Sequence, residues 1–292
     1  MPEYFPFNPD PRAPREAPPA NTCDAQFHVF GDPDVYPMRA DAPFRMPSAT
    51  IDAALHMHRA LGVERGVIVQ ATTYGADHSV VLDALEQAGP DYRGCANAIA
   101  LTERDDAYIE TLHEAGVRGA RFTFRKELGV GLSPREFRHA AGRLRELGWY
   151  AKIQPEKHGI LDSVELYEDL DIPVLIDHLG RADARLGVDD PNVRKTIELL
   201  GKGNFWVMLS LGEKISAEGY PWDDVLPIAR AYIDAAPNRV VWASDWPHPL
   251  SRTPPPNDAE LLELLYRYAP DEAERQRILV DNPAELFGFD RS

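Results

Sequence analysis

The chain has 292 residues, 44% of them hydrophobic and 27% charged, a composition typical of globular proteins with one large domain or two small ones. Its net charge of −16 argues against binding nucleic acid or an anionic membrane surface, because the summed field would repel phosphates. The sequence has no apolar run of about 18 residues and no signal-peptide core, so neither membrane spans nor secretion are expected.

Residues 1–20 are rich in proline, show no periodicity and predict an arm that lies on the surface or on a neighbouring subunit, which leaves a homo-oligomer open. From residue 21 onward, short apolar runs alternate with amphipathic stretches, as in βα units. Strands are expected at 22–30, 66–70, 93–98, 118–124, 149–154, 173–177, 205–210 and 240–244. Helices are expected at 50–62, 78–88, 104–115, 134–147, 159–170, 191–200, 222–236 and 258–268.

Eight alternations without a proline-rich linker favour one domain over residues 21–292, an α/β fold of the (β/α)8 TIM-barrel type. The segment 271–286 is expected to add a helix pair, broken at Asn282-Pro283. Cys23 and Cys95 are far apart and form no C-x-x-C pair, so no disulfide framework or thiolate metal site is expected. A reducing, cytoplasmic location fits this cysteine usage.

Catalytic groups of a parallel barrel lie where the strands end and the βα loops begin. The first strand ends in DAQFH, and two-residue alternation places Gln26 and His28 on one inward face. His178 and Asp245 follow the sixth and eighth strands. One histidine at a strand end is more often structural, but three such groups converging on one opening indicate a catalytic site. His248 is a loop residue near the same opening.

Basic residues also gather at the strand ends of this acidic chain. They are Arg121, Arg125, Lys126, Lys152, Arg181 and Lys214. An inward guanidinium costs desolvation unless an anion pairs with it, so a substrate with at least one carboxylate is expected. The histidines within helical patterns are expected to be packing or surface residues; they are His56, His58, His78, His113 and His139.

At DAQFHVFG, VRGARFTF, IDHLGR and WASDWPHP the chain resembles the amidohydrolase superfamily, in the amidohydrolase 2 branch that includes 2-pyrone-4,6-dicarboxylate lactonase and related lactone hydrolases. The resemblance runs from about residue 22 to the closing DNPAELFGF. It implies a distorted (β/α)8 barrel that opens a lactone ring. It also implies that Asp245 is the general base on water, that His178 and His28 surround the substrate carbonyl, and that Arg121 binds substrate.

The departures from this family concern metal and substrate. Metal-dependent members carry H-x-H on the first strand, whereas this chain has Gln26-Phe27-His28, and an amide is a poor zinc ligand. We therefore expect no cofactor, the alternative being one divalent ion such as zinc on His28, His178 and Asp245. Glu127 and Lys214 stand where arginines are expected, and Gln154 replaces an aromatic hydroxyl, so the substrate should differ from 2-pyrone-4,6-dicarboxylate itself.

The sequence thus predicts a lactonase that opens a carboxylated lactone, of the pyrone-dicarboxylate, muconolactone or aldarolactone type, by Asp245-activated water in aromatic catabolism. The expected substrate-binding residues are Arg121, Arg125, Lys214, Arg181, Gln154, Gln26, Lys152 and His248. The alternatives are a metal-dependent hydrolase, hydratase or decarboxylase of the same superfamily, a lactone isomerase, and, least favoured, a non-catalytic binding module.

Overall fold

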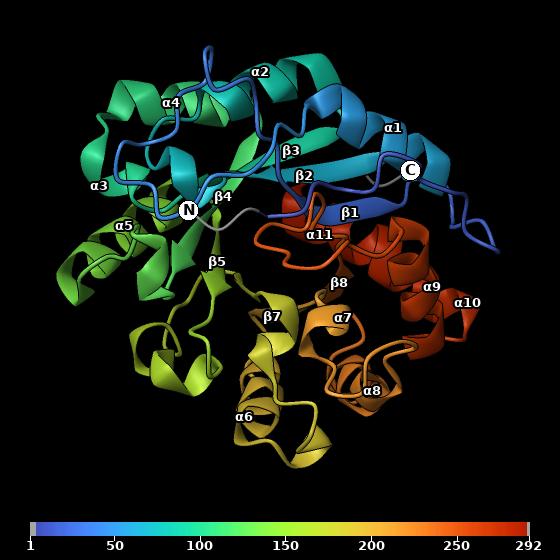
Figure 1. The fold of residues 1–292 in the computed structure, drawn as a ribbon. Coiled ribbons are helices and arrows are strands. Elements are labelled where there is room, and N and C mark those ends of the chain that lie inside the picture. The colour runs from blue at the N-terminus through green and yellow to red at the C-terminus, as the bar shows by residue number, and fades with distance from the viewer. Residues whose placement is uncertain (1–3, 291–292) are drawn as a thin grey trace.

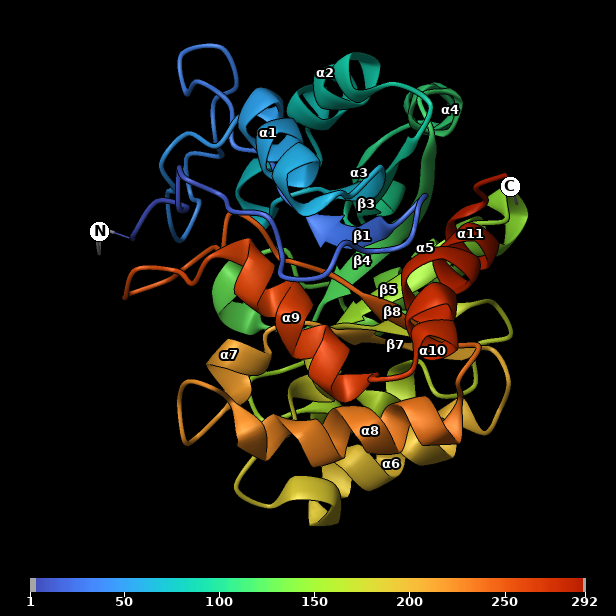
Figure 2. The same ribbon diagram turned by 90° about the vertical axis from the view of Figure 1, so that its right-hand side faces the viewer.

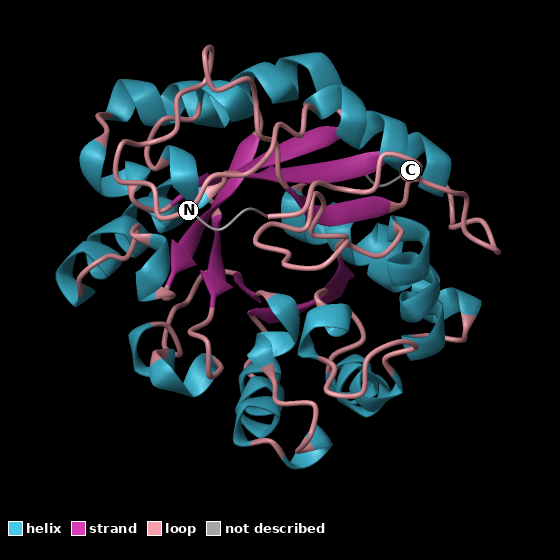
Figure 3. Ribbon diagram, in the orientation of Figure 1, coloured by secondary structure: helices cyan, strands magenta, loops and turns pink. Residues whose placement is uncertain are grey.

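The computed structural model describes residues 4–290 and shows eight parallel strands arranged as a barrel, with helices around the outside (Figures 1 and 3). The strands are β1 (Cys23–Phe27), β2 (Arg65–Val69), β3 (Tyr92–Asn97), β4 (Val117–Thr123), β5 (Tyr150–Gln154), β6 (Val174–Ile176), β7 (Phe205–Leu209) and β8 (Val240–Trp242). Each strand pairs in parallel with the next one along the chain. The predicted barrel is confirmed.

The strands are buried along almost their whole length, as expected where helices cover one face and packed side chains fill the other. Inside the barrel, residues such as Val67, Leu175 and Met208 form one apolar cluster. Phe287 belongs to this cluster and lies 5.3 Å from the ring of Tyr150, so the C-terminal helix closes the end of the barrel opposite the strand C-termini. The open end is thereby left to the loops that follow the strands.

The helices follow the predicted order (Figure 2). They are α1 (Ile51–Leu61), α2 (Ser79–Ala88), α3 (Ala100–Glu103), α4 (Asp106–Glu114), α5 (Pro134–Leu147), α6 (Pro191–Leu200), α7 (Gly212–Ile215), α8 (Leu226–Ala235), α9 (Asp258–Tyr268), α10 (Glu272–Gln276) and α11 (Asn282–Phe287). Capping boxes begin α5 at Ser133 and α9 at Asn257, so local sequence sets both starts. No helix within residues 4–290 is long and apolar enough to cross a membrane.

Two predicted elements are wrong. The helix expected at 159–170 is replaced by two short 3-10 turns, Ile160–Asp162 and Val164–Leu166. Ser163 between them has a φ of −145°, which no helix accommodates, and the Tyr167 hydroxyl donates to the carbonyl of Ile160 at 3.1 Å. Local side-chain bonds therefore replace the helical ladder here.

The break expected at Asn282-Pro283 is also absent. A π-helical turn, Arg277–Asp281, joins α10 directly to α11. Proline is tolerated in the first turn of α11, where a backbone N–H has no helical partner. The Asn282 amide donates to the carbonyls of Pro237 and Val240, at 3.0 and 2.7 Å, and so anchors the helix on β8.

The strands β8 and β1 close the barrel without a ladder between them in the described part of the chain. Two backbone hydrogen bonds beyond the strands join this seam, from Asp245 N to Gln26 O at 3.0 Å and from His28 N to Trp246 O at 2.7 Å. The buried carboxylate of Asp24 also bridges it, because one oxygen accepts from the Ser244 backbone at 3.0 Å and the other from the Ser244 hydroxyl. His58 of α1 lies 3.2 Å from the second oxygen.

Candidate active site

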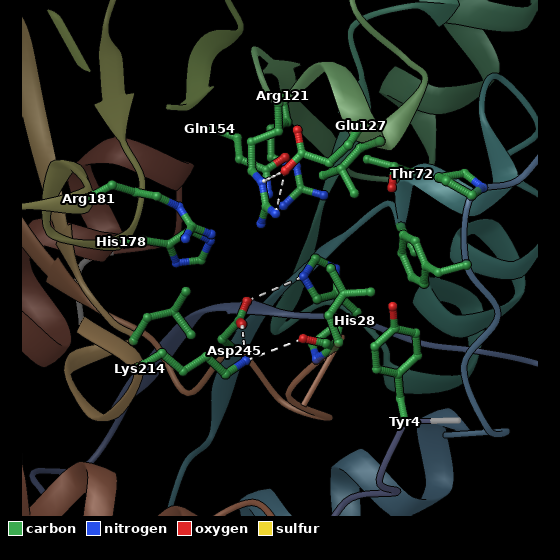
Figure 4. Close-up of a pocket in the computed structure, with 18 of the residues that line it drawn as sticks. Tyr4, His28, Thr72, Arg121, Glu127, Gln154, His178, Arg181, Lys214 and Asp245 are labelled. Atoms are coloured by element: carbon green, nitrogen blue, oxygen red, sulfur yellow. Dashed lines mark hydrogen bonds and ion pairs between the residues drawn. The ribbon is translucent and has the colours of Figure 1, made fainter. Parts of the chain in front are cut away.

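A cavity of about 480 Å³ opens at the C-terminal ends of the strands (Figure 4). Five of its lining side chains are cationic and two are acidic. The polar and charged residues that line it are Tyr4, His28, Thr72, Arg121, Arg125, Glu127, Gln154, His178, Arg181, Lys214, Asp245 and Arg252. In an acidic protein, this local excess of positive charge makes the cavity a site for anions.

Asp245 is a buried carboxylate just after β8, on backbone with a φ of +59°. Its Oδ1 accepts a 2.6 Å hydrogen bond from the Gln26 amide and lies 3.4 Å from Nε2 of His28, while Oδ2 lies 3.9 Å from the Lys214 ammonium. Burial opposes ionisation, but His28 and the Lys214 ammonium hold the pKa of Asp245 well below its ordinary value. Asp245 is therefore ionised near neutrality and able to accept a proton.

Two histidines flank this carboxylate, each fixed by its other ring nitrogen. Nδ1 of His28 lies 2.7 Å from the Val69 carbonyl, which can only accept, so Nδ1 carries a hydrogen. Nδ1 of His178 lies 2.9 Å from the Ser210 hydroxyl, which can donate to it. Burial lowers the pKa of His178 well below its ordinary value, against the pull of Asp245. A neutral His178 that accepts from Ser210 carries its hydrogen on Nε2, where it can donate to a bound ligand.

Gln26 reaches Asp245 because of an irregularity in β1. The ladder between β1 and β2 shifts register between Asp24 and Phe27. Ala25 packs in the inner apolar cluster and Phe27 in the outer one, yet Gln26 between them bonds to Asp245 and lies 3.5 Å from Nε2 of His178. Such bulges redirect side chains next to active sites.

The cations of the cavity differ in what already pairs with them. Arg125 donates two hydrogen bonds, of 2.9 and 2.6 Å, to one oxygen of Glu127. Arg121 donates to the Gln70 carbonyl at 3.3 Å. Nε of Arg181 is buried without a hydrogen-bond partner among residues 4–290, and burial, with Arg125 nearby, lowers the pKa of Arg181 to about 10. Arg181 is thus still a cation at neutral pH. Nε of Arg121 is likewise buried without a hydrogen-bond partner in the described part of the chain, so both guanidinium groups can donate to a bound anion.

Two expected substrate-binding residues lie behind the cavity wall and do not line it. Nζ of the fully buried Lys152 is 2.8 Å from Oδ1 of Asp177, and Asp177 lies 4.0 Å from the Arg121 guanidinium. Nε2 of His248 is 3.0 Å from Asp258 at the start of α9. Their positions at strand ends predicted direct contact with substrate. In the structure each residue instead pairs with a carboxylate behind the cavity lining and supports the residues that do line it.

The remaining expected residues take part as follows. Gln154 lines the cavity and accepts a 3.0 Å hydrogen bond from the Thr123 hydroxyl. Gln26 is beneath the cavity surface and acts on Asp245. Sequence reasoning missed Tyr4 and Arg252, which line the cavity from the N-terminal arm and from the loop after β8. Neither belongs to a periodic segment at a strand end, so no pattern pointed to them.

The side chains around Asp245 bear on whether the site could hold a metal ion. Among residues 4–290 no group of three or more His, Cys, Asp or Glu side chains is placed to hold a metal ion. The amide of Gln26 directs an N–H at Asp245, so its side chain offers a donor where a cation needs a lone pair.

Comparison with known proteins identifies the family of the chain. The amidohydrolase family model matches residues 23–289. The chain belongs to the amidohydrolase family. It is 36% identical to 4-sulfomuconolactone hydrolase of Rhizobium radiobacter, over 95% of both chains, and 33% identical to 2-pyrone-4,6-dicarboxylate hydrolase of Comamonas testosteroni, over 98% of this chain and 96% of that protein. The family resemblance of the sequence motifs is confirmed.

Its fold is also similar to a crystal structure of an Agrobacterium tumefaciens protein, with a TM-score of 0.83 and 26% identity over 96% of this chain and 98% of that one.

Proposed function

We propose that this amidohydrolase is a lactonase that opens a lactone carrying an anionic substituent, with Asp245 activating water and without a metal ion. The observation that carries the proposal is an ionised, buried Asp245 facing a cavity in which cations outnumber acids. Its relatives are named hydrolases of a sulfomuconolactone and of a pyrone dicarboxylate, which are both anionic lactones.

The reaction begins when Asp245 accepts a proton from water as the water oxygen bonds to the lactone carbonyl carbon. Negative charge then develops on the carbonyl oxygen. His178 can stabilise it through Nε2–H, an effect worth roughly 2.7–4 kcal/mol per donor in comparable sites. Nε2 of His28 lies 3.4 Å from Asp245, on the other side of the carboxylate. It can share the proton that Asp245 has accepted from water.

The second step breaks the ring C–O bond and re-forms the carbonyl. The departing ring oxygen takes the proton that Asp245 had accepted, so the carboxylate is restored and one water has been added. Without a metal to polarise it, the ester must be reactive by itself. That requirement favours activated lactones, such as pyrones and muconolactones, over amides.

The substituent is held by guanidinium groups. Arg121 and Arg181 both line the cavity, and each has a buried Nε that no residue between 4 and 290 satisfies. A carboxylate or sulfonate that accepts from these groups would supply the missing counter-charge. Glu127 already neutralises Arg125, so Arg125 is the weaker candidate for this role.

The test is turnover on a panel of matched lactones in isotopically labelled water. Muconolactones, aldarolactones and pyrone carboxylates are compared with their methyl esters, and products are identified by mass spectrometry. Hydrolysis incorporates label from the water, whereas an isomerase moves the acyl group and incorporates none. Preference for the methyl esters, or products free of label, would contradict the proposal.

A further inference from the structure

The N-terminal arm, residues 4–20, is bound to the outside of the barrel beside the cavity, where Figures 1 and 2 show it running past the loop that follows β8. Its first contacts lie at the cavity rim. The backbone N–H of Phe5 donates to the Ser251 carbonyl at 3.0 Å, and the ring of Phe7 packs at 4.7 Å against the buried Trp246. The arm is therefore attached to the loop that carries Asp245.

Farther along, α9 holds the arm by charge. The Arg12 guanidinium donates to both oxygens of Glu263, at 2.7 and 3.0 Å. The backbone of Arg12 donates to the Asn257 side chain at 3.3 Å, and the Asn257 amide donates to the Asp10 carbonyl at 3.0 Å. A two-bond pair supported by neighbouring hydrogen bonds fixes geometry better than a single surface ion pair. This part of the arm is accordingly held in one place.

Because the arm is attached in this way, Tyr4 at its start is held at the cavity. Its side chain lines the cavity together with His28, Lys214 and Asp245. Figure 4 shows Tyr4 at the edge of the pocket, across from Arg181 in this view, and no dashed line joins its hydroxyl to the other residues drawn. Phe44 meets the ring edge-on at 6.3 Å, which supports its orientation without using the hydroxyl.

We propose that Tyr4 is a substrate-binding residue whose hydroxyl hydrogen-bonds to the bound lactone, and that the N-terminal arm forms part of the active-site wall. This inference rests on the proposed function, since the ligand is an anionic lactone. A phenol can donate to a ring or carbonyl oxygen and pack its face against an unsaturated ring. Tyr4 would thus select among lactones by how they fill the side of the cavity farthest from Arg181.

Substitution at position 4 separates binding from packing. Tyr4→Phe keeps the ring against Phe44 and removes only the hydroxyl, so KM should rise about 3- to 10-fold while kcat stays within about twofold, the effect of one neutral hydrogen bond. Tyr4→Ala should raise KM further. If Tyr4→Phe leaves KM unchanged and only Tyr4→Ala alters it, the ring merely packs and the proposed contact does not exist.

The tether offers a second test away from the cavity. Arg12→Gln removes the pair with Glu263 and should raise KM in the same direction as the Tyr4 variants, because the arm must then be ordered when substrate binds. Arg15→Gln is the matched control. The Arg15 side chain is 84% exposed and comes no closer than 3.9 Å to Glu263, a weak contact, so its substitution should leave KM unchanged. Equal effects of the two arginine variants would show that charge alone, and not attachment, is responsible.

The outcomes also separate this inference from the function on which it rests. Lactone turnover with a KM that is indifferent to both Tyr4 variants overturns the role of Tyr4 and leaves the lactonase intact. Absence of turnover on the whole panel, with no binding of citrate as an anionic probe in calorimetry, overturns both. If the protein binds citrate but turns over no lactone, and Tyr4→Phe weakens the citrate binding, the binding role of Tyr4 is supported and the lactonase proposal is contradicted. Melting temperatures near the wild-type value confirm that each variant is folded.

Discussion

Gln26 and Asp245 are joined side chain to side chain by a 2.6 Å hydrogen bond and main chain to main chain by a second one of 3.0 Å. The first bond stabilises the ionised carboxylate, and the second sets the distance between the strand ends that carry the two residues. Gln26 also stands at the position where metal-dependent relatives in the superfamily are expected to have a histidine. Gln26 therefore affects both the ionisation of Asp245 and the capacity of the site to bind a metal ion.

Asp245→Asn should lower kcat by about 10²- to 10⁴-fold, because the amide cannot accept a proton from water. The variant can still accept from Gln26, so the fold and ligand binding should be preserved. Steady-state kinetics together with citrate titration measure the two effects. A variant that retains more than about a tenth of wild-type kcat would remove Asp245 as the base.

Chelation should leave kcat unchanged, and elemental analysis should find far less than one equivalent of zinc, manganese or iron per chain. Gln26→His should raise zinc affinity without raising activity, since the added imidazole supplies a ligand but removes the N–H donor to Asp245. Activity lost on chelation and restored by one particular ion would instead establish the single-metal alternative.

Arg181→Met should lower kcat/KM for anionic lactones by roughly 10- to 100-fold, the range of a charge-assisted hydrogen bond, and should barely affect their methyl esters. Arg121→Met should do the same, but it also takes a cation from the vicinity of the buried Asp177 and so should lower the melting temperature. A double-mutant cycle between each arginine and the substrate carboxylate measures the coupling. Coupling near zero at both positions would show that neither arginine binds the anion.

Stability should increase with pH between about 4 and 6.5 because of His78. Burial lowers the pKa of His78 to about 4, and its Nε2 accepts from the Asn97 backbone at 3.1 Å, which requires the neutral ring. In this window the unfolded chain binds a proton that the folded chain does not, so unfolding is favoured as pH falls. The contribution is on the order of 3 kcal/mol.

Urea titrations at several pH values measure this dependence. His78→Gln, whose side-chain oxygen can still accept from Asn97, should be less sensitive to pH than the wild type. The exposed His56 provides the control, and His56→Gln should follow the wild-type curve. Parallel curves for all three proteins would assign the pH dependence to other groups.

The order of the strands and the position of the candidate catalytic side chains could be predicted from the sequence because both follow from periodicity. Apolar runs buried on both faces mark the strands, and the chain direction puts His28, His178 and Asp245 at one end of the barrel. The helix expected at 159–170 failed because a hydroxyl and a backbone turn, invisible to a hydrophobic pattern, decide the conformation there.

Residues whose role depends on distant partners could not be assigned in the same way. Lys152 and His248 lie at or just beyond strand ends, which usually supply substrate contacts. Lys152 is paired with Asp177 and His248 with Asp258, so both face away from the cavity lining. Tyr4 is about 240 residues from Asp245, and its place in the cavity is set by contacts of the arm with α9 and Ser251. Such pairings between remote segments leave no local signature.

The seam between β1 and β8 joins the first and the last strands of the barrel along the chain. His28 and Gln26 are synthesised early, whereas the segment that carries Asp245, just after β8, is synthesised almost last. The two meet through Asp24 and Ser244, through two backbone bonds, and through the contacts of Asp245 with Gln26 and His28. A chain that ends before residue 240 contains most of the barrel and most of the cationic side chains of the cavity, but it lacks the proposed base. If Asp245 is that base, turnover requires that the two ends of the sheet have joined.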